Sequence, residues 1–272
     1  MAIPHAPKEV TLTLLLACSR RINNQPGLSD DKRKASLLRS SHLRLNGRGL
    51  QRLSHLDMCP NARVLYAFDN LIEDLLPACD AKLLESVYAQ NNLISTVPSD
   101  FGKLLPNLTR LYLNGNKISM FSGWAGVESS VLAELHLADQ QDCTDGLSFD
   151  SDTLVSLSGS LKVLDISGNK LHSLSFLNGL TSLETLLADH NELNDTEDVI
   201  AFISQNTSLK VLSLLGNPVC ASSSILRDGA VLLCPQLEFF NGKSVSEAER
   251  QFVQRKSKSN AVLQSMLDNV TY

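Results

Sequence analysis

The chain is poor in aromatic residues, has no excess of positive charge and contains no long apolar run. Aromatic side chains make up 5% of the 272 residues, and 24 Lys and Arg stand against 29 Asp and Glu, for a formal net charge of −5. A chain without a basic field does not attract a phosphate backbone, so no nucleic-acid partner is expected. No stretch reaches the roughly 18 apolar residues of a membrane span, so we also expect no membrane contact.

Cysteine is present, but without the spacing that binds metal. The six cysteines form no CxxC pair and no Cys/His cluster of the kind that holds zinc. They are Cys18, Cys59, Cys79, Cys143, Cys220 and Cys234. We therefore expect no structural metal, and we interpret the cysteines as free thiols of a protein in a reducing compartment, the cytoplasm.

Motifs that carry catalysis are also missing. The sequence contains no GxSxG, HExxH or GxGxxG motif and no complete phosphate-binding loop. Gly242-Lys243-Ser244 looks like the end of such a loop, but Leu237 stands where its leading glycine belongs. We predict that the chain is not an enzyme and uses no cofactor.

The sequence does contain a repeated pattern, LxxLxLxxNxL, with clear copies at residues 108–118 and 161–171. Its fourth position is apolar in eight copies spaced 22 to 29 residues apart: Leu43, Leu65, Val87, Leu111, Leu135, Leu164, Leu186 and Leu212. Repeats of this length and pattern each form a strand and a return segment. The prediction is an α/β leucine-rich-repeat solenoid of about eight repeats. It is a curved right-handed superhelix with a parallel sheet on its concave face and a cap at each end.

The ninth position of the pattern is asparagine in six repeats: Asn70, Asn92, Asn116, Asn169, Asn191 and Asn217. A short amide can satisfy backbone groups of the turns inside the stack, so we assign these side chains a structural and not a catalytic role. Two repeats depart from the pattern. The first has Arg48 at this position, and the fifth has Gln140, followed by Asp142 where an apolar residue belongs.

The pattern divides the chain into three segments. Residues 1–36 are predicted to form an N-terminal capping helix and a polar loop, 37–220 the repeats, and 221–272 a C-terminal cap and helix. The first helix is expected to cover the first repeat with an apolar face at Leu12, Leu14, Leu15, Leu16 and Ile22. The alternative for residues 10–18 is a signal peptide, which the lack of a positive excess before them disfavours.

Two further segments carry helix signals. Residues 141–160, in the long fifth repeat, predict a convex-side helix with Asp152 near its start. Residues 237–243 suit an element that closes the last repeat, and Ser246 with Glu249 forms a capping box before a C-terminal helix. Four basic residues of that helix are interpreted as a solvated face, with an acidic partner such as tubulin as the alternative: Arg250, Arg255, Lys256 and Lys258.

Strand residues that alternate with the leucines face outward and line up between repeats into columns about 5 Å apart. These columns are aromatic in repeats two to four and acidic in repeats five to seven. Exposed aromatics offer contact area at little entropic cost, and the acids suit a basic rim on a partner. We predict that ten residues of this concave face bind a protein: Tyr66, Phe68, Tyr88, Gln90, Tyr112, Glu134, His136, Asp139, Asp165 and Asp189.

Two alternatives stay open for these columns. The aromatic residues could pack on one another and stabilise neighbouring strands. The acids near His136 and His190 could hold a metal ion, although carboxylates on an open surface are usually only solvated.

The motifs resemble the leucine-rich-repeat regulators of protein phosphatase 1 over nearly the whole chain. The resemblance rests on residues 132–137, 147–150, 153–157, 161–169, 216–220, 227–228, 237–239, 242–243 and 249–252. It implies a non-catalytic subunit that binds the phosphatase catalytic subunit at the centrosome or basal body of the cytoskeleton, near tubulin and dynein or kinesin components. We expect a monomer apart from this partner.

One feature of many phosphatase partners is absent, the short docking motif of a basic residue followed by Val/Ile-x-Phe/Trp. Residues 63–66 come nearest, but they end in Tyr66 and commit Leu65 to the core, so docking would use the concave face. A first alternative is an axonemal or dynein-associated repeat protein that binds tubulin or motor subunits. A second is a secreted recognition protein, for which four asparagines provide glycosylation sequons: Asn107, Asn194, Asn206 and Asn269.

Overall fold

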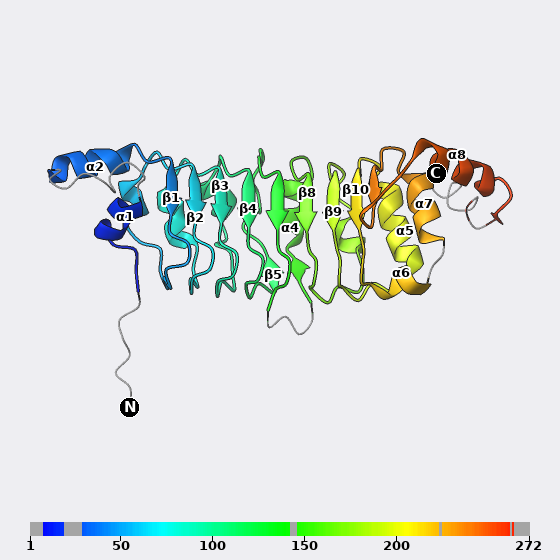
Figure 1. Cartoon of the computed structure of the whole chain (residues 1–272), viewed down its shortest axis with the longest axis horizontal. Helices are drawn as coiled ribbons and strands as arrows, with labels where there is room; N and C mark the ends of the chain where they lie inside the picture. The colour runs from blue at the N-terminus through cyan, green and yellow to red at the C-terminus, as the bar shows by residue number, and fades with distance from the viewer. Residues whose placement is uncertain (1–7, 19–28, 142–145, 223–224, 262, 264–272) are drawn as a thin grey trace, which may run out of the picture.

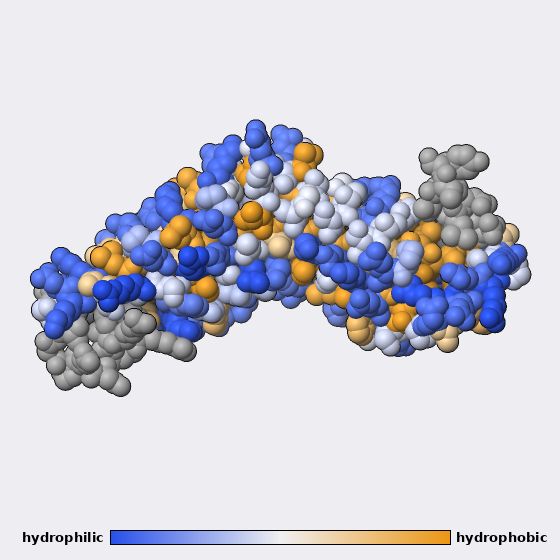
Figure 2. Space-filling view, turned by 90° about the horizontal axis from the view of Figure 1, so that it is seen from above, coloured by the Kyte–Doolittle hydropathy of each residue, from blue (hydrophilic) through white to orange (hydrophobic). Residues whose placement is uncertain are grey.

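The computed structural model describes residues 8–18, 29–141, 146–222, 225–261 and 263. The chain winds into an elongated solenoid whose strands lie side by side (Figure 1), and seen from above the solenoid is arched (Figure 2). No helix in these described stretches is long and apolar enough to cross a membrane.

One ten-stranded sheet runs along the solenoid in the order β1-β2-β3-β4-β6-β8-β9-β10-β11-β12. Its neighbouring strands are parallel except for the last pair, β11 and β12. The strands are β1 (His42–Arg44), β2 (Val64–Tyr66), β3 (Ser86–Tyr88), β4 (Arg110–Tyr112), β6 (Glu134–His136), β8 (Val163–Asp165), β9 (Thr185–Leu187), β10 (Val211–Ser213), β11 (Phe239–Phe240) and β12 (Lys243–Ser244).

Short helices and turns return the chain from each strand to the next. The α-helices are α1 (Leu12–Cys18), α2 (Asp30–Leu38), α3 (Phe101–Leu104), α4 (Ser151–Leu157), α5 (Thr196–Gln205), α6 (Pro218–Ser222), α7 (Leu226–Leu233) and α8 (Glu247–Ser257). Three 3₁₀ turns accompany them: η1 (Leu56–Met58), η2 (Leu76–Asp80) and η3 (Ser175–Leu177). A second small sheet pairs β5 (Met120–Phe121) with β7 (Ser148–Phe149).

The eight predicted anchor residues are the central residues of the eight repeat strands. Each is at most 2% exposed, and neighbouring anchors pair directly across the sheet, as Leu43 does with Leu65 and Leu135 with Leu164. Because strand side chains alternate between faces, the residues on either side of each anchor point away from the core. They lie on the solvent-facing surface of the sheet, which is the concave face of the solenoid and is called the outer face below. The predicted solenoid, its register and its eight repeats are therefore confirmed.

The buried amides of the ninth position connect consecutive repeats. Asn116 Nδ2 donates to the carbonyl oxygens of Leu113 (2.8 Å) and Ala89 (2.9 Å), while its Oδ1 accepts from the Ile94 N–H (3.1 Å). Gln140 makes the same set of bonds in the fifth repeat, so this predicted departure changes the side chain but not the contacts. In the first repeat the Arg48 backbone N–H donates to Asn70 Oδ1 at 3.0 Å.

The long fifth repeat contains the predicted convex-side helix, α4. Its N-cap is Asp150, which accepts a 2.8 Å bond from the Thr153 N–H, and Asp152 follows in the first turn. The pairing of β5 with β7 was not predicted. An interior row of aromatic rings, with 5.4–5.9 Å between neighbouring centroids, packs beside it: Phe101, Trp124, Phe121, Phe149 and Phe176. Asp142 lies outside the described residues.

The N-terminal cap contains the predicted helix, α1, which buries Leu15 against the first repeat. The preceding Val10 donates its N–H to the Arg52 carbonyl at 3.3 Å, so the segment also extends the first turn. Leu12 is 36% exposed and does not belong to the buried face. The predicted polar loop is wrong in its second half, because α2 begins at Asp30 and buries Leu37 in the core. Ile22 lies outside the described residues.

The C-terminal cap closes the stack as predicted. β11 extends the parallel sheet and β12 folds back on it. Ser246 is the N-cap of α8, and its Oγ accepts from the Glu249 N–H at 3.1 Å. The Glu249 carboxylate pairs with Arg227 through two bonds of 2.7 and 3.0 Å. Arg227 also donates to the Phe240 and Ser244 carbonyls, which ties α7, the last strands and α8 together.

The basic patch predicted on α8 is only partly a solvated face. Arg250 donates to the Cys234 and Leu237 carbonyls, and Lys256 pairs with Asp228 at 2.5 Å. Since two of the four cations stabilise the cap from within, the remaining exposed pair, Arg255 and Lys258, provides little charge for an acidic partner.

The buried anchors give the first prediction. Leu111→Ala and Leu164→Ala should each lower the free energy of unfolding by about 2–5 kcal/mol, because each leaves a cavity in the stack. Chemical denaturation measures this, with Leu71→Ala as control, since Leu71 is 45% exposed. A loss below about 0.5 kcal/mol at either anchor would contradict the assigned register.

The second prediction concerns the cap. Glu249→Gln should lower cap stability by about 1 kcal/mol, because the pair with Arg227 is bidentate but partly exposed to solvent. The hydrogen bond from Arg227 also lowers the Glu249 pKa. The stabilisation is therefore present above the ordinary glutamate pKa of about 4.3 and is lost as the pH falls through the lowered value.

Hydrogen exchange of residues 247–257 at pH 7 tests this second prediction. Exchange should be faster in Glu249→Gln than in the wild type. Glu247→Gln, a change on the same helical turn at an exposed position, should leave it unchanged. Equal exchange in all three proteins would show that the Arg227 pair does not hold α8 in place.

Candidate functional site

A column of stacked aromatic rings crosses the outer face of the sheet from β1 to β6. Its members are His42, Tyr66, Tyr88, Tyr112 and His136, with centroid distances of 6.3, 5.1, 4.7 and 4.2 Å in that order. The interplanar angles are 25° or less, so the rings lie nearly parallel. In-register pairing of Tyr66 with Tyr88 and of Tyr88 with Tyr112 produces this arrangement directly from the repeat.

The stacking agrees with one of the two alternatives left open for this column. The three tyrosine rings pack on one another across neighbouring strands. Each stacked pair stabilises the fold by about 0.5–1.5 kcal/mol beyond the area that it buries. The rings are only half-buried, so the column is both a structural element and a solvent-facing surface.

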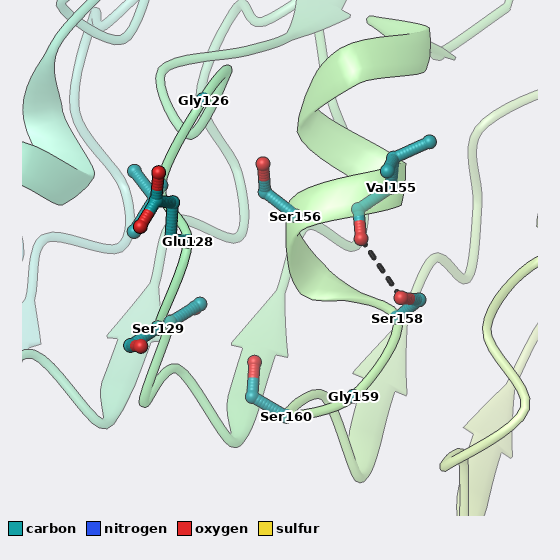
Figure 3. Close-up of a pocket in the computed structure, with 10 residues that line it drawn as sticks. Gly126, Glu128, Ser129, Val155, Ser156, Ser158, Gly159 and Ser160 are labelled. Carbon is teal, nitrogen blue, oxygen red and sulfur yellow. Dashed lines mark hydrogen bonds between the residues drawn. The ribbon is translucent and has the colours of Figure 1, made fainter.

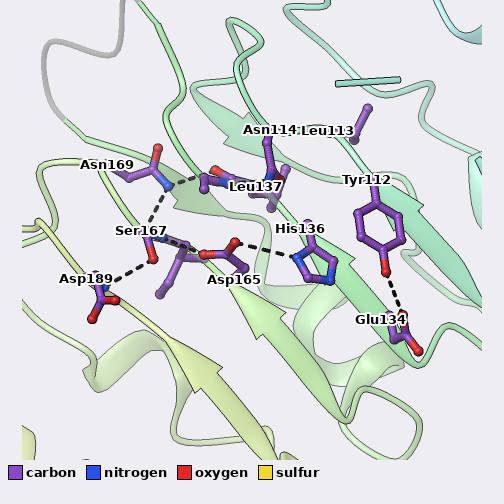
Figure 4. Close-up of polar contacts among 12 residues, drawn as sticks. Tyr112, Leu113, Asn114, Glu134, His136, Leu137, Asp165, Ser167, Asn169 and Asp189 are labelled. Atoms are coloured by element: carbon purple, nitrogen blue, oxygen red, sulfur yellow. Dashed lines mark hydrogen bonds and ion pairs between the residues drawn. The ribbon is translucent and has the colours of Figure 1, made fainter. Parts of the chain in front are cut away.

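Charged groups surround the stack at both ends. The Arg44 guanidinium lies 5.1 Å from the centroid of the Tyr66 ring, a cation–π contact. At the other end the Tyr112 hydroxyl donates to Glu134 Oε2 at 2.9 Å (Figure 4). Arg110 Nε donates to the other carboxylate oxygen, Glu134 Oε1, at 3.1 Å. Burial and the hydrogen bond to Glu134 together raise the pKa of Tyr112 to about 12, so this hydroxyl remains a donor at neutral pH.

The last ring of the stack is paired with a carboxylate. His136 Nδ1 lies 3.5 Å from Asp165 Oδ2, and both side chains are less than a fifth exposed (Figure 4). Burial on its own raises the pKa of Asp165, but hydrogen bonds from His136 and Ser167 outweigh it and hold that pKa below its ordinary value. Asp165 is therefore an anion at neutral pH that fixes the histidine ring.

The two predicted acidic residues in the turns after β6 and β9 differ in how their carboxylates are used. Asp189 Oδ1 accepts from Ser213 Oγ at 2.6 Å and from the Leu215 N–H at 2.7 Å, so its carboxylate is occupied within the sheet. Asp139 lies in the turn after β6 with φ of 55°, and its Oδ1 would be 2.1 Å from a Cβ added at Gly168. The Asp189 carboxylate therefore has less to offer to a partner, whereas Asp139 remains exposed.

Phe68 and Gln90 lie beyond the stack, where β2 and β3 lead into their turns. They line a shallow hollow of about 390 Å³ together with Asp69, Asn91 and Asn114. Asp69 accepts a 2.8 Å bond from Asn91 Nδ2, and Gln90 Oε1 is a buried oxygen for which the described residues provide no hydrogen-bond partner. The sequence analysis did not single out Asp69, Asn91 and Asn114, although Asp69 and Asn91 occupy the same position of successive repeats and Asn114 follows Phe68 and Gln90 in theirs.

A second hollow, of about 540 Å³, lies between residues 126–130 and α4 (Figure 3). Serine predominates among its polar side chains, Glu128 is its charged group, and the flanking Val155 is 73% exposed. The Ser158 hydroxyl donates to the Val155 carbonyl at 2.8 Å and is thus used within the helix end. This hollow gathers no set of groups with a shared chemistry.

The described cysteines are free thiols, and burial makes them poor nucleophiles. It raises the pKa of Cys59 and of Cys79 to about 11 and that of Cys234 to about 12. Within the described stretches no group of three or more His, Cys, Asp or Glu could hold a metal ion. The side chains of the concave face can therefore stack on rings, accept and donate hydrogen bonds, and pair with charged groups of a partner. Cys143 lies outside the described residues.

Comparison with known proteins agrees with this geometry. A family model described as leucine-rich repeats in two copies matches residues 82–126 and 160–201. The human protein Podocan-like protein 1 is 29% identical over 146 residues, which is 52% of this chain and 27% of that protein. The chain thus spans about a quarter of the length of this curated relative.

Two solved internalins of Listeria monocytogenes share the architecture. InlF superposes with a TM-score of 0.57 and 21% identity over 76% of this chain and 55% of its own. Internalin C2 gives a TM-score of 0.53 and 18% identity over 84% and 91% of the two chains. At this level of identity the likeness establishes the fold. With the matched repeats and the eight in-register strands, it shows that the chain has the leucine-rich-repeat solenoid fold.

Proposed function

We propose that the chain is a non-catalytic scaffold that binds another protein on its concave sheet. The observation that carries this proposal is the column of five stacked rings from His42 to His136. Rings that are already fixed by their neighbours lose little conformational freedom when a partner covers them, which favours binding. Tyrosine is also among the residues that most often dominate the energy of an interface.

The charges around the stack define how a partner would lie on it. Arg44 marks the N-terminal end, while Glu134 and Asp165 lie at the C-terminal end. A partner segment with an apolar middle, an acidic group toward Arg44 and a basic group toward Glu134 would match this order. Such complementarity fixes orientation more than it adds affinity.

The partner that we propose is the catalytic subunit of protein phosphatase 1, at the centrosome or basal body. The resemblance to its leucine-rich-repeat regulators supports this choice. Leu65 is fully buried, so residues 63–66 cannot act as an extended docking motif without unfolding a strand. Docking on the concave surface is the remaining route for this partner, and tubulin or motor subunits are the alternative that the test below can identify.

One observation bears on the alternative of a secreted protein. Asn206, in one of the four sequons, is fully buried, and its Nδ2 donates to the Phe202 carbonyl at 2.8 Å. A glycan attached to this nitrogen would have to pass through the core beneath α5. Asn107 and Asn194 are exposed, so a glycosidase-sensitive shift in mobility would have to come from them, and Asn269 lies outside the described residues.

The third prediction tests the stack as a binding surface. Tyr88→Ala should weaken binding of the purified phosphatase catalytic subunit at least tenfold, because it removes a central ring and both of its stacking contacts. Tyr88→Phe keeps the ring and should lose much less. Calorimetric titration measures both, and Val155→Ala, on the convex side, is the matched surface control.

Circular dichroism melts separate binding from folding in this test. Tyr88→Phe should melt with the wild type, whereas Tyr88→Ala should melt lower because the stack is interrupted. Wild-type affinity in Tyr88→Ala would remove the stack from the binding site. If the wild-type chain does not bind the phosphatase at all, the partner is wrong, and capture of tubulin or motor subunits from ciliated cells becomes the discriminating experiment.

A further inference from the structure

The hollow beside the tyrosine stack has a chemistry of its own. It lies just beyond the ends of β2, β3 and β4, where Phe68, Gln90 and Asn114 follow Tyr66, Tyr88 and Tyr112 by two positions. Residues two apart in a strand point to the same face, so Phe68, Gln90 and Asn114 share the outer face with the three tyrosines. A partner that covers the stack therefore covers the hollow as well.

The polar lining consists of one negative charge, on Asp69, and three side-chain amides, on Gln90, Asn91 and Asn114. The Asp69 carboxylate is exposed and receives one bond, from Asn91 Nδ2, although a carboxylate can accept about four. The lining contains no Lys, Arg or His. Gln90 adds an oxygen without a hydrogen-bond partner among the described residues, and leaving a buried acceptor in this state is unfavourable. The hollow thus favours a cationic donor.

The volume of the hollow and the Phe68 ring indicate which kind of cation fits it best. At about 390 Å³ the hollow lies near the small end of the roughly 300–1,000 Å³ typical of ligand pockets, which suits one side chain. A single carboxylate is a poor cage for Ca²⁺, which takes about six to eight oxygen ligands. A guanidinium is planar, has five donors, is weakly hydrated and stacks on aromatic rings such as Phe68. The ammonium of lysine has the same positive charge as the guanidinium but lacks its planar shape and its five donors.

We propose that the hollow formed by Phe68, Asp69, Gln90, Asn91 and Asn114 is a subsite that receives an arginine side chain of the bound protein. The guanidinium pairs with Asp69, stacks against Phe68 and donates to the Gln90 amide after that amide turns outward. The subsite rests on the proposed function, because it presupposes a protein on the concave face. It adds the chemistry of one contact that the partner must make beside the tyrosines.

The test uses a probe that does not depend on the phosphatase. The chain, with its side-chain amides labelled with nitrogen-15, is titrated with N-acetyl-arginine amide and followed by NMR. The side-chain amide signals of Gln90, Asn91 and Asn114 should shift with increasing probe concentration. N-acetyl-citrulline amide, a neutral probe of nearly the same shape, should shift them at least threefold less at equal concentration, and N-acetyl-lysine amide should fall between the two.

Two variants show whether the carboxylate is responsible. Asp69→Asn keeps an acceptor for Asn91 and tolerates the left-handed backbone at this position (φ 56°), so the fold should survive. It should weaken arginine binding at least threefold. Glu73→Gln makes the same change of charge at an exposed residue outside the hollow and should have no effect.

The outcomes separate this proposal from the proposed function. Equal shifts with arginine and citrulline probes, or unchanged binding in Asp69→Asn, would overturn the subsite. Arginine binding at the hollow by a chain that does not bind the phosphatase would support the subsite and reject that partner. Phosphatase binding that is lost in Tyr88→Ala but unaffected by Asp69→Asn would support the concave surface and reject the subsite.

Discussion

The buried amide at the ninth position of each repeat is the interaction on which the rest of the structure depends. A single repeat cannot bury its leucines, so each needs a neighbour in fixed register. The amide supplies that register, because Asn116 bonds the carbonyls of Leu113 in its own repeat and of Ala89 in the preceding one, and accepts from Ile94. Each such group replaces water for three backbone partners, which would otherwise be buried unsatisfied.

Fixed register has a direct consequence on the outer face. When anchors pair one to one, residues beside them must also align, and the tyrosines of β2, β3 and β4 become a stack without any further device. The same alignment restricts the turns. Gly115 and Gly168 lie with positive φ directly beneath Asn91 Oδ1 and Asp139 Oδ1 of the preceding repeats, where a Cβ would be only 2.5 and 2.1 Å away. The left-handed backbone favours glycine at both positions, and a side chain added there would also displace the preceding Asn91 or Asp139 side chain.

The sequence revealed the periodic part of this molecule because periodicity is local. The anchors, the amide ladder, α4 and the C-terminal capping box each follow from residue type at a fixed spacing. Contacts between non-repeating segments were not accessible in the same way. The helix α2 depends on burial of Leu37 in the core, and the β5–β7 pair depends on interior rings that come from four different return segments.

The candidate site also has a part that follows from the repeat pattern and a part that does not. Columns of outward residues could be read from the repeat, and eight of the ten predicted residues lie on or beside the stack, the hollow or the His136–Asp165 pair. The engagement of Asp189 was not foreseen, because its bonds to Ser213 and Leu215 of the next repeat depend on side-chain directions that spacing does not specify. Charge count alone thus overstated how acidic the available surface is.

The double role of the stack limits how specificity can arise. Rings that stabilise the sheet cannot be altered freely without loss of stability, and their faces are already covered by one another, so only edges and hydroxyls remain for a partner. Edges of tyrosine accept many apolar surfaces and discriminate weakly between them. Discrimination must then come from groups around the stack that the fold leaves with unused hydrogen-bonding or charge capacity, such as Arg44, Asp69 and Gln90.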